Sequence, residues 1–445
     1  MPLLIPSYDD KTLQKLYPDY LSLRLVQVIH RHGERAPRKR LTEFIPGLWN
    51  LCHAAQACIL LPQQGIDELH FEFSSNLPPL SASLTGLAES SRIQKVISLP
   101  GDCSESQLTD IGRTSMSQLG AHLRDLYVNR LKFLDAKISD ENDESIYLRS
   151  TYFNRTFESL HQLFIGGLYP SKYRENSFSL KIHTRDPYSE NLYANHKCKR
   201  FFELLSEFQK TASSRHESKL KSLNEKLKPI VNEVSFSSNP SCNELLAKSN
   251  GIPLPKEFTA DVIDDLNAVS TGRSFGGFDE IPELRRLGIG PLLFELQDQI
   301  LSKIGNSKES ADNLKLAIYS THDVTIAPLL AALDAYENRR WPPFASHIII
   351  ELFQQKSSSS QAKIDDKDRV KNRKTVDIEN QGEYFVRVKY NNKILELSGC
   401  QKNGTHHTND KSLCTLKAFL EILNEQIPVD FEKECHVTYK KTKKA

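Results

Sequence analysis

A histidine stands between two arginines in the segment Arg31-His32-Gly33-Glu34-Arg35, directly after the apolar run 23–29. Two guanidinium groups that lie this close repel each other unless an anion sits between them, and the planar guanidinium group fits a phosphate. An imidazole held beside such a phosphate can attack the phosphorus atom as a nucleophile. The segment therefore predicts phosphate chemistry, with a solvated basic loop as the alternative because the run 38–40 is also basic.

Two further segments carry side chains suited to the same chemistry. His322-Asp323 follows the apolar stretch 314–319, and residues 149–156 pass from a short strand into a helix. The amide groups at the start of a helix, together with an arginine, favour an anion, so Arg155 is a candidate ligand. Taken alone, His322 would be a buried core histidine and Asp323 a helix cap. The presence of all three segments favours a common site, and we expect Arg149 to serve a structural role paired with a carboxylate.

These segments must be positioned by strands and helices. Residues 23–29 and 314–319 are rich in β-branched and apolar side chains, which predicts buried strands. Thr109 predicts the start of a helix whose apolar residues recur three and four positions apart. Strands joined through helices are typical of an α/β fold, in which ligands bind at the carboxyl ends of the strands. Both histidines occupy such ends, so we expect them to converge.

The same patterns predict the domain organisation. We expect a discontinuous α/β core formed by residues 20–180 and 290–436, with a central mixed sheet flanked by helices. Residues 181–289 carry little strand signal and several charged helical stretches, which predicts an inserted helical cap region over the site. Residues 38–105 predict long loops and short helices.

Two segments near the C-terminus are expected to lie apart from the core. Residues 348–353 and 384–390 predict an antiparallel pair of strands, and the low-complexity loop 355–381 connects them. Residues 437–445 form a basic tail that we expect to be solvated.

The composition limits the possible partners. The 445-residue chain is 39% hydrophobic and 26% charged, as in a soluble globular protein. A net charge of +2 gives no reason to expect nucleic acid, and no apolar run is long enough for a transmembrane segment. Residues 1–20 have the features of neither a secretory signal nor a mitochondrial presequence. We therefore expect a cytoplasmic location, with a mitochondrial one as the alternative.

On these segments the sequence resembles the histidine acid phosphatase family over roughly residues 23–436. Within that family the likeness is greatest to the lysophosphatidic acid phosphatase type 6 branch. The motifs that carry the resemblance are Arg31-His32-Gly33-x-Arg35-x-Pro37, Leu108-Thr109-x-x-Gly112, Arg149-Ser150-Thr151-x-x-x-Arg155-Thr156, His322-Asp323-Val324-Thr325 and Trp341-Pro342-Pro343-Phe344-Ala345.

The resemblance implies an α/β fold with a phosphoglycerate mutase-like core and an enzyme that hydrolyses phosphate monoesters. It implies that His32 is the nucleophile and forms a phosphohistidine, while Asp323 protonates the leaving alcohol. The residues implied to bind the phosphoryl oxygens are Arg31, Arg35, Arg155 and His322. Neither a metal nor another cofactor is expected, because arginines supply the positive charge. A carboxyl general acid favours an acidic or near-neutral optimum.

Several readings of the substrate stay open. Lysophosphatidic acid or a related lipid phosphate is the leading expectation, and a sugar phosphate or an inositol phosphate is the alternative. A catalytically inactive anion-binding scaffold would also explain the basic segments, although every expected catalytic residue is present. The expected partner is a small phosphate monoester, and the sequence leaves the oligomeric state open.

The resemblance also bears on the eight cysteines. It implies that Cys198 would pair with Cys435 and Cys400 with Cys414. A further pair of the family would join Cys242 to the position of His347, so that bridge cannot form here. With no recognised signal peptide, we expect the thiols to be mostly reduced.

Overall fold

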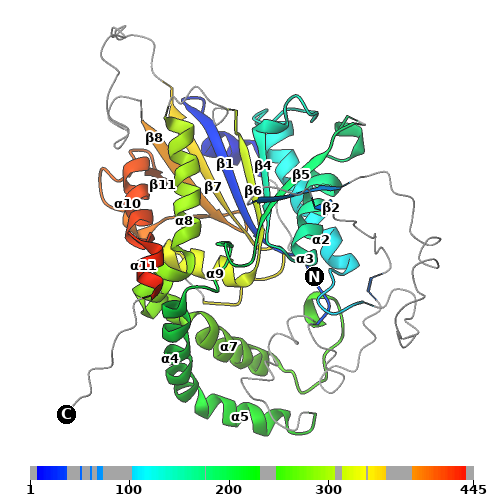
Figure 1. The fold of residues 1–445 in the computed structure, drawn as a ribbon, viewed down its shortest axis with the longest axis vertical. Coiled ribbons are helices and arrows are strands. Elements are labelled where there is room, and N and C mark those ends of the chain that lie inside the picture. The colour runs from blue at the N-terminus through cyan, green and yellow to red at the C-terminus, as the bar shows by residue number, and fades with distance from the viewer. Residues whose placement is uncertain are drawn as a thin grey trace, which may run out of the picture.

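The computed structural model describes residues 8–37, 51–52, 61–62, 68–73, 103–175, 177–230, 247–305, 313–336, 339–356 and 383–436. Within them an eleven-stranded mixed sheet lies between two layers of helices (Figure 1), which confirms the predicted α/β fold. The strands are β1 (Leu21–Arg31), β2 (Leu61–Pro62), β3 (Glu68–Phe73), β4 (Ile146–Ser150), β5 (Leu180–Arg185), β6 (Leu316–Thr321), β7 (His347–Gln355), β8 (Tyr384–Tyr390), β9 (Lys393–Leu395), β10 (His406–His407) and β11 (Asp410–Thr415).

The centre of the sheet is parallel and its flanks are antiparallel. The order is β10-β11-β8-β7-β1-β6-β4-β5-β3-β2, with β9 paired to β8. Strands β1, β6, β4 and β5 run parallel, whereas β7 and β3 run antiparallel to their neighbours β1 and β5. In this register Arg31 lies opposite Thr321 and Ser150 opposite Ser320. The residues that follow these strand ends therefore meet at one edge of the sheet.

Helices cover both faces of the sheet and form a group beyond its edge. They are α1 (Asp10–Leu16), α2 (Asp110–Leu123) continued by η1 (Arg124–Arg130), η2 (Asp143–Ser145), α3 (Asn154–His161) continued by η3 (Gln162–Leu168), η4 (Ser171–Tyr173), α4 (Lys199–Arg215), α5 (Glu217–Leu227), α7 (Ala260–Glu280), α8 (Pro282–Ile304), α9 (Asp323–Ala332), η6 (Ser398–Cys400), α10 (Leu416–Gln426) and α11 (Phe431–His436).

Strand β1 shows how the sequence forms two cores. Leu25 and Ile29 pack on the face covered by α8, α9 and α10, whereas Val26 and Val28 pack on the face covered by α2 and α3. All four side chains are buried. Full burial of each stabilises the fold by about 1.5–3 kcal/mol, so the central strands are firmly held and can position a site at their ends.

Helices α4, α5 and α7 lie beyond the carboxyl ends of the central strands, where α9 begins (Figure 1). An apolar cluster that includes Phe201, Phe278 and Ala331 joins α4 and α7 to α8 and α9. The boundaries proposed for the cap, 181–289, differ from this arrangement. Strand β5 belongs to the central sheet, where Leu180, Ile182 and Thr184 are buried between charged or polar neighbours; that polar alternation concealed the strand. Helix α8 begins at Pro282, because proline is pre-organised for the first turn of a helix.

Other expectations meet the structure in part. Strands β2 and β3 fall in the region 38–105, for which we predicted loops and helices, and they extend the sheet beyond β5. The predicted antiparallel pair 348–353 and 384–390 is confirmed as β7 and β8. The low-complexity loop lies outside the described residues apart from Gln355 and Lys356, and the basic tail 437–445 lies outside them entirely.

The expectation of reduced thiols is wrong for six cysteines. Cys198–Cys435 and Cys400–Cys414 are disulfides, in the pairing that the resemblance implied, and Cys52–Cys103 is a third that we did not anticipate. Folding brings the Cα atoms of each pair to 4.5–5.4 Å, the separation that a disulfide needs. Cys242 lies outside the described residues, and His347 is buried. Disulfides persist in oxidising compartments. The cytoplasmic location stays a prediction, and non-reducing electrophoresis of the native protein tests it.

In the part of the chain that the structure describes, no helix combines the length and the apolar character needed to cross a membrane.

Candidate active site

The predicted site residues meet at the carboxyl ends of β1, β6 and β4. His32 follows β1, His322 and Asp323 follow β6, and Arg155 lies in the first turn of α3 after β4. The loop after β1 is held tightly against α2, because a Cβ atom on Gly33 would lie 2.5 Å from the carbonyl oxygen of Gly112. Only glycine permits this approach of two backbones.

The hydrogen bond of the His32 ring fixes which nitrogen is free. Nδ1 lies 2.8 Å from the carbonyl oxygen of Gly33. A carbonyl oxygen only accepts, so Nδ1 carries the hydrogen and donates it, and Nε2 keeps its lone pair. The ring is buried and its centroid lies 5.6 Å from that of His322. The geometry therefore presents Nε2 as a nucleophile.

The surroundings of His32 keep its ring neutral. Burial lowers the pKa of His32 well below its usual range, and the nearby basic groups Arg155, Arg31, His322 and Arg35 lower it further. Both causes disfavour the imidazolium form. His32 therefore stays unprotonated in mildly acidic solution, as a nucleophile requires. The cationic groups that we expected around this ring are close enough to act on it.

His322 is neutral for the same reasons. Burial and then the charge of Arg155 lower the pKa of His322 to about 3. Its Nε2 lies 2.9 Å from Oγ1 of Thr151, and its Nδ1 lies 3.5 Å from Nη2 of Arg155. The Thr151 hydroxyl group both donates and accepts, so this contact holds the ring whichever of its nitrogens carries the hydrogen. Thr151 thereby fixes the orientation of the His322 ring beside His32.

Asp323 lies at the start of α9, where Oδ1 accepts a hydrogen bond of 2.9 Å from the N–H group of Val324 and Oδ2 contacts two side chains. Its Oδ2 atom lies 2.8 Å from Nη2 of Arg31 and accepts a hydrogen bond of 2.9 Å from Nε1–H of Trp341. Burial alone would raise the pKa of Asp323, but the charge of Arg31 and the Trp341 hydrogen bond outweigh burial, and the net shift is downward. The carboxyl group is therefore ionised in the free enzyme, whereas the general-acid role requires its protonated form.

The two arginines of the first motif are both held by the backbone. Arg31 donates to the carbonyl oxygen of Pro342, and its guanidinium lies 3.9 Å from the centroid of the Phe344 ring. Arg35 is buried and donates to the carbonyl oxygen of Ala36 at 2.8 Å. Such contacts fix the guanidinium groups before a ligand arrives, which lowers the entropic cost of binding an anion.

Sequence reasoning missed several residues of the site. Trp341 and Phe344 were part of the resemblance, but we assigned them no role, although a tryptophan N–H so near Asp323 proves to be a donor. The hydrogen bond between Thr151 and His322 joins residues 171 positions apart, and no local pattern predicts it. The ring of Tyr193 lies 6.2 Å from that of His322 and was also unassigned.

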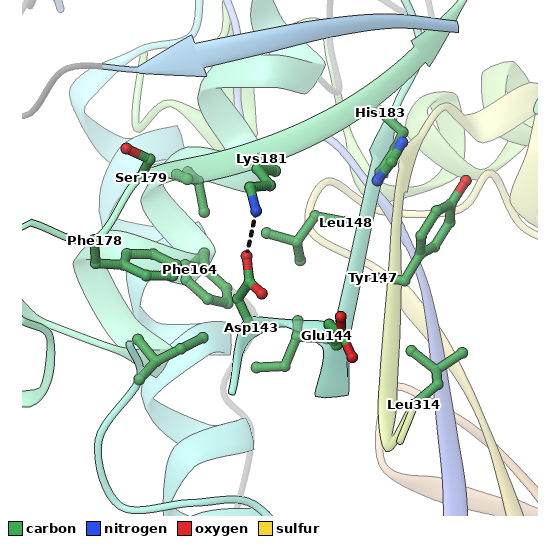
Figure 2. Close-up of a pocket in the computed structure, with 13 residues that line it drawn as sticks. Asp143, Glu144, Tyr147, Leu148, Phe164, Phe178, Ser179, Lys181, His183 and Leu314 are labelled. Carbon is green, nitrogen blue, oxygen red and sulfur yellow. Dashed lines mark hydrogen bonds and ion pairs between the residues drawn. The ribbon is translucent and has the colours of Figure 1, made fainter. Parts of the chain in front are cut away.

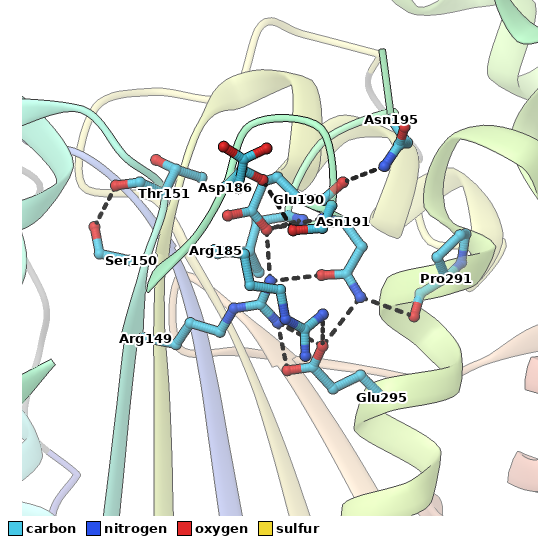
Figure 3. A network of polar contacts seen from close by, with 12 residues as sticks. Arg149, Ser150, Thr151, Arg185, Asp186, Glu190, Asn191, Asn195, Pro291 and Glu295 are labelled. Carbon is cyan, nitrogen blue, oxygen red and sulfur yellow. Dashed lines mark hydrogen bonds and ion pairs between the residues drawn. The ribbon is translucent and has the colours of Figure 1, made fainter. Parts of the chain in front are cut away.

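Arg149 has the structural role that we predicted. Its guanidinium is buried and pairs with Glu190 and Glu295, each at 2.5 Å, and donates to Asn191 at 2.7 Å (Figure 3). Arg185 contributes a further ion pair to Glu295 at 3.1 Å. These contacts connect β4 and β5 to α8 and to the loop after β5.

A cavity of about 470 Å³ lies at the opposite ends of the same strands (Figure 2). Ile146 at the start of β4, Leu180 at the start of β5 and Leu314 just before β6 line it, and Lys181 pairs with Asp143 at its wall. None of the predicted site residues lines this cavity. Among the described residues, no group of three or more histidine, cysteine, aspartate or glutamate side chains is arranged to hold a metal ion.

Relatives and solved structures resemble this chain along most of its length. A probable acid phosphatase of Schizosaccharomyces pombe is 31% identical over 94% of this chain and 95% of its own length. The human lysophosphatidic acid phosphatase type 6 is 26% identical over 91% of this chain and 83% of its own length. A phytase of Hafnia alvei has a TM-score of 0.57 at 13% identity, covers 95% of this chain and is itself wholly covered. That likeness shows the fold.

The family follows from the motif and the match together. The model of the histidine phosphatase superfamily (branch 2) matches residues 22–391, which include both histidines and Arg155. The identity to the human lysophosphatidic acid enzyme is below that to the fission yeast protein, so these matches support the family rather than one branch. The chain therefore belongs to branch 2 of the histidine phosphatase superfamily and is a histidine acid phosphatase, a hydrolase of phosphate monoesters.

Proposed function

We propose that hydrolysis proceeds through a phosphohistidine at Nε2 of His32. The observation that carries the proposal is the fixed tautomer of His32, whose Nδ1 donates to Gly33 and leaves Nε2 free among basic groups. Arg31, Arg35, Arg155 and His322 bind the phosphoryl oxygens. Preorganised donors of this kind stabilise the charge that develops in the transition state.

The reaction has two steps. In the first, Nε2 forms a bond to phosphorus as the bond from phosphorus to the ester oxygen breaks, and the carboxyl group of Asp323 gives its proton to the leaving alcohol. In the second, the Asp323 carboxylate takes a proton from water, which attacks phosphorus and releases inorganic phosphate and free His32. Each residue ends in its initial state.

The low pKa of Asp323 in the free enzyme is compatible with this role. Arg31 and Trp341 stabilise the carboxylate, but a bound phosphate dianion adds negative charge beside it and competes for Arg31. A nearby like charge raises the pKa of a carboxyl group. Substrate binding thus promotes the protonated form that the first step needs, at acidic or near-neutral pH.

We infer that the substrate is lysophosphatidic acid or a related lipid phosphate. The similarity to the human lysophosphatidic acid phosphatase type 6 supports this choice. So do the exposed side chains of Tyr152 and Phe153, which directly precede α3, since the Phe153 ring lies 4.6 Å from the Arg155 guanidinium and provides apolar surface there.

Two variants test the reaction. With His32→Ala, hydrolysis of an aryl phosphate is expected to fall by at least about 10⁴-fold, because the nucleophile is lost. Mass spectrometry of rapidly quenched wild-type enzyme should locate an acid-labile phosphoryl group on the peptide that contains His32. Substantial turnover by His32→Ala, or a phosphoryl group on another residue, would contradict the proposal.

Asp323→Asn tests the proton donor separately. An aryl alcohol leaves easily without a proton, whereas an alkyl alcohol does not. The loss in kcat/KM should therefore be larger for glycerol phosphate than for an aryl phosphate, by about 10-fold or more. Equal losses for both substrates would assign Asp323 a binding role instead.

A further inference from the structure

A row of aromatic rings leads away from the phosphate site. The Tyr193 ring lies 6.2 Å from His322, the His196 ring 5.4 Å from Tyr193, and the Phe202 ring 6.0 Å from His196, stacked parallel to it. Phe153 joins the row at its inner end, 6.5 Å from Tyr193. We call Phe153, Tyr193, His196 and Phe202 the aromatic row.

The row presents apolar surface to solvent. Phe153 is 41% exposed and Phe202 is 38% exposed, while Phe201 next to Phe202 is buried in the seam between α4 and α8. Single exposed apolar side chains are ordinary, but a contiguous series that ends at a binding site indicates a ligand contact. The exposed rings here are continuous with His322, which faces the phosphate position.

The loop that carries Tyr193 and His196, between β5 and α4, is fixed at several points. Glu190 and Asn191 are bound by Arg149 (Figure 3), and the hydroxyl of Thr325 donates to the carbonyl oxygen of Leu192. Cys198, at the start of α4, is bonded to Cys435. The rings are thus held in place before a ligand binds, so little conformational entropy is lost on binding.

We propose that the aromatic row binds the apolar part of the leaving group, which is the acyl chain that a monoacylglycerol phosphate carries on its glycerol. This inference rests on the proposed function and specifies which part of the protein selects the substrate. With phosphate held among Arg31, Arg155 and His322, the ester oxygen and its chain extend from the site along Tyr193 towards Phe202. Each buried methylene group then increases kcat/KM by up to about fourfold.

Chain length provides the test. The substrates are glycerol phosphate and its monoacyl derivatives of increasing length, each below its critical micelle concentration. For the wild type, log kcat/KM should rise with chain length. Phe202→Ala should lower that slope for the longer chains and leave kcat/KM for glycerol phosphate within about twofold. Phe202→Leu, which keeps an apolar side chain, should restore most of the slope.

Phe294→Ala is the matched control, because Phe294 is also an exposed phenylalanine, 58% exposed, but lies on α8 outside the row. It should leave the slope unchanged. The inference is overturned if the wild type hydrolyses all chain lengths equally, or if Phe202→Ala and Phe294→Ala behave alike. Turnover of glycerol phosphate by His32→Ala would instead overturn the proposed reaction, so the two failures are distinguishable.

Discussion

Arg149 and Arg155 flank the same strand end, only six residues apart, yet they serve different purposes. Arg149 is fully buried, and its charge is matched by the carboxylates of Glu190 and Glu295. Arg155 lies at the start of α3 beside the neutral ring of His322 and helps to lower the pKa of His32. One arginine is matched by the protein's own carboxylates, and the other adds to a group of basic side chains.

The difference shows how a folded chain separates stability from function. An arginine buried between carboxylates favours one arrangement of strands and loops, and its charge interacts with the protein's own groups rather than with a ligand. Gathering several basic groups around a histidine raises the local positive potential, which a phosphate lowers when it binds. A second matched cluster, Glu351 with Lys389 and Arg387 on β7 and β8, is of the first kind.

The largest expected effect belongs to the matched arginine. Arg149→Ala leaves Glu190 buried without its cation, and we expect the free energy of unfolding to fall by about 3–5 kcal/mol. Urea unfolding measures the change. Lys219→Ala, which removes an exposed ion pair with Asp265, is the control and should cost less than about 1 kcal/mol. Similar losses for the two variants would mean that the Arg149 network is not a stabilising element.

Arg155 should show the opposite behaviour. Arg155→Ala is expected to lower kcat/KM by about 10²–10³-fold, because one donor to the phosphoryl group is lost, and to change the free energy of unfolding by less than about 1 kcal/mol. Arg155→Lys keeps the charge but not the forked geometry, so it should recover only part of the activity. If Arg155→Ala instead unfolded the protein as Arg149→Ala does, the proposed contrast would fail.

Trp341 tests how the site sets the pKa of its carboxyl group. Trp341→Phe removes the hydrogen bond to Asp323, which favours the carboxylate, so the pKa of Asp323 should rise. The limb of the kcat profile that falls with increasing pH should move upward by about one pH unit. Phe275→Leu is the control, because it alters the apolar contact of the Trp341 ring and keeps its N–H group. An equal shift in both variants would exclude the hydrogen bond as the cause.

A partly buried histidine, His161, extends the comparison to groups that can lose their charge. Burial, then the charge of Arg174, lowers the pKa of His161 to about 4. The unfolded chain therefore binds one more proton than the folded protein between about pH 6.5 and pH 4. This contribution to stability is present above pH 6.5 and is lost as the pH falls, at about 1.4 kcal/mol per pH unit.

His161→Leu should reduce that acid sensitivity. Urea unfolding at several pH values between 7 and about 4 should give a shallower decline for the variant than for the wild type. An exposed histidine, His436, provides the control substitution, which should leave the decline unchanged. Parallel declines for His161→Leu and the wild type would contradict the expected role of burial.

Local patterns of residue type and spacing predicted much of the fold. The β-branched run at 23–29 predicted the central strand, and the spacing of apolar residues after Thr109 predicted α2, whose cap the structure confirms. They failed where a strand alternates with charge, as in Leu180–Arg185, because polar neighbours mask the buried face. The pairing of Cys52 with Cys103 was equally hidden, since a disulfide depends on distances that spacing in the sequence does not give.

The sequence by itself determined the residue types of the site: an imidazole between two arginines, a second histidine with a carboxyl neighbour, and an arginine at a helix start. Only the tertiary structure decided that Nε2 of His32 is free, that Trp341 holds Asp323, and that an aromatic row extends from His322. The physical reason is that tautomers, pKa values and ring contacts depend on atoms within a few ångströms. Parallel strands bring those atoms together from positions hundreds of residues apart.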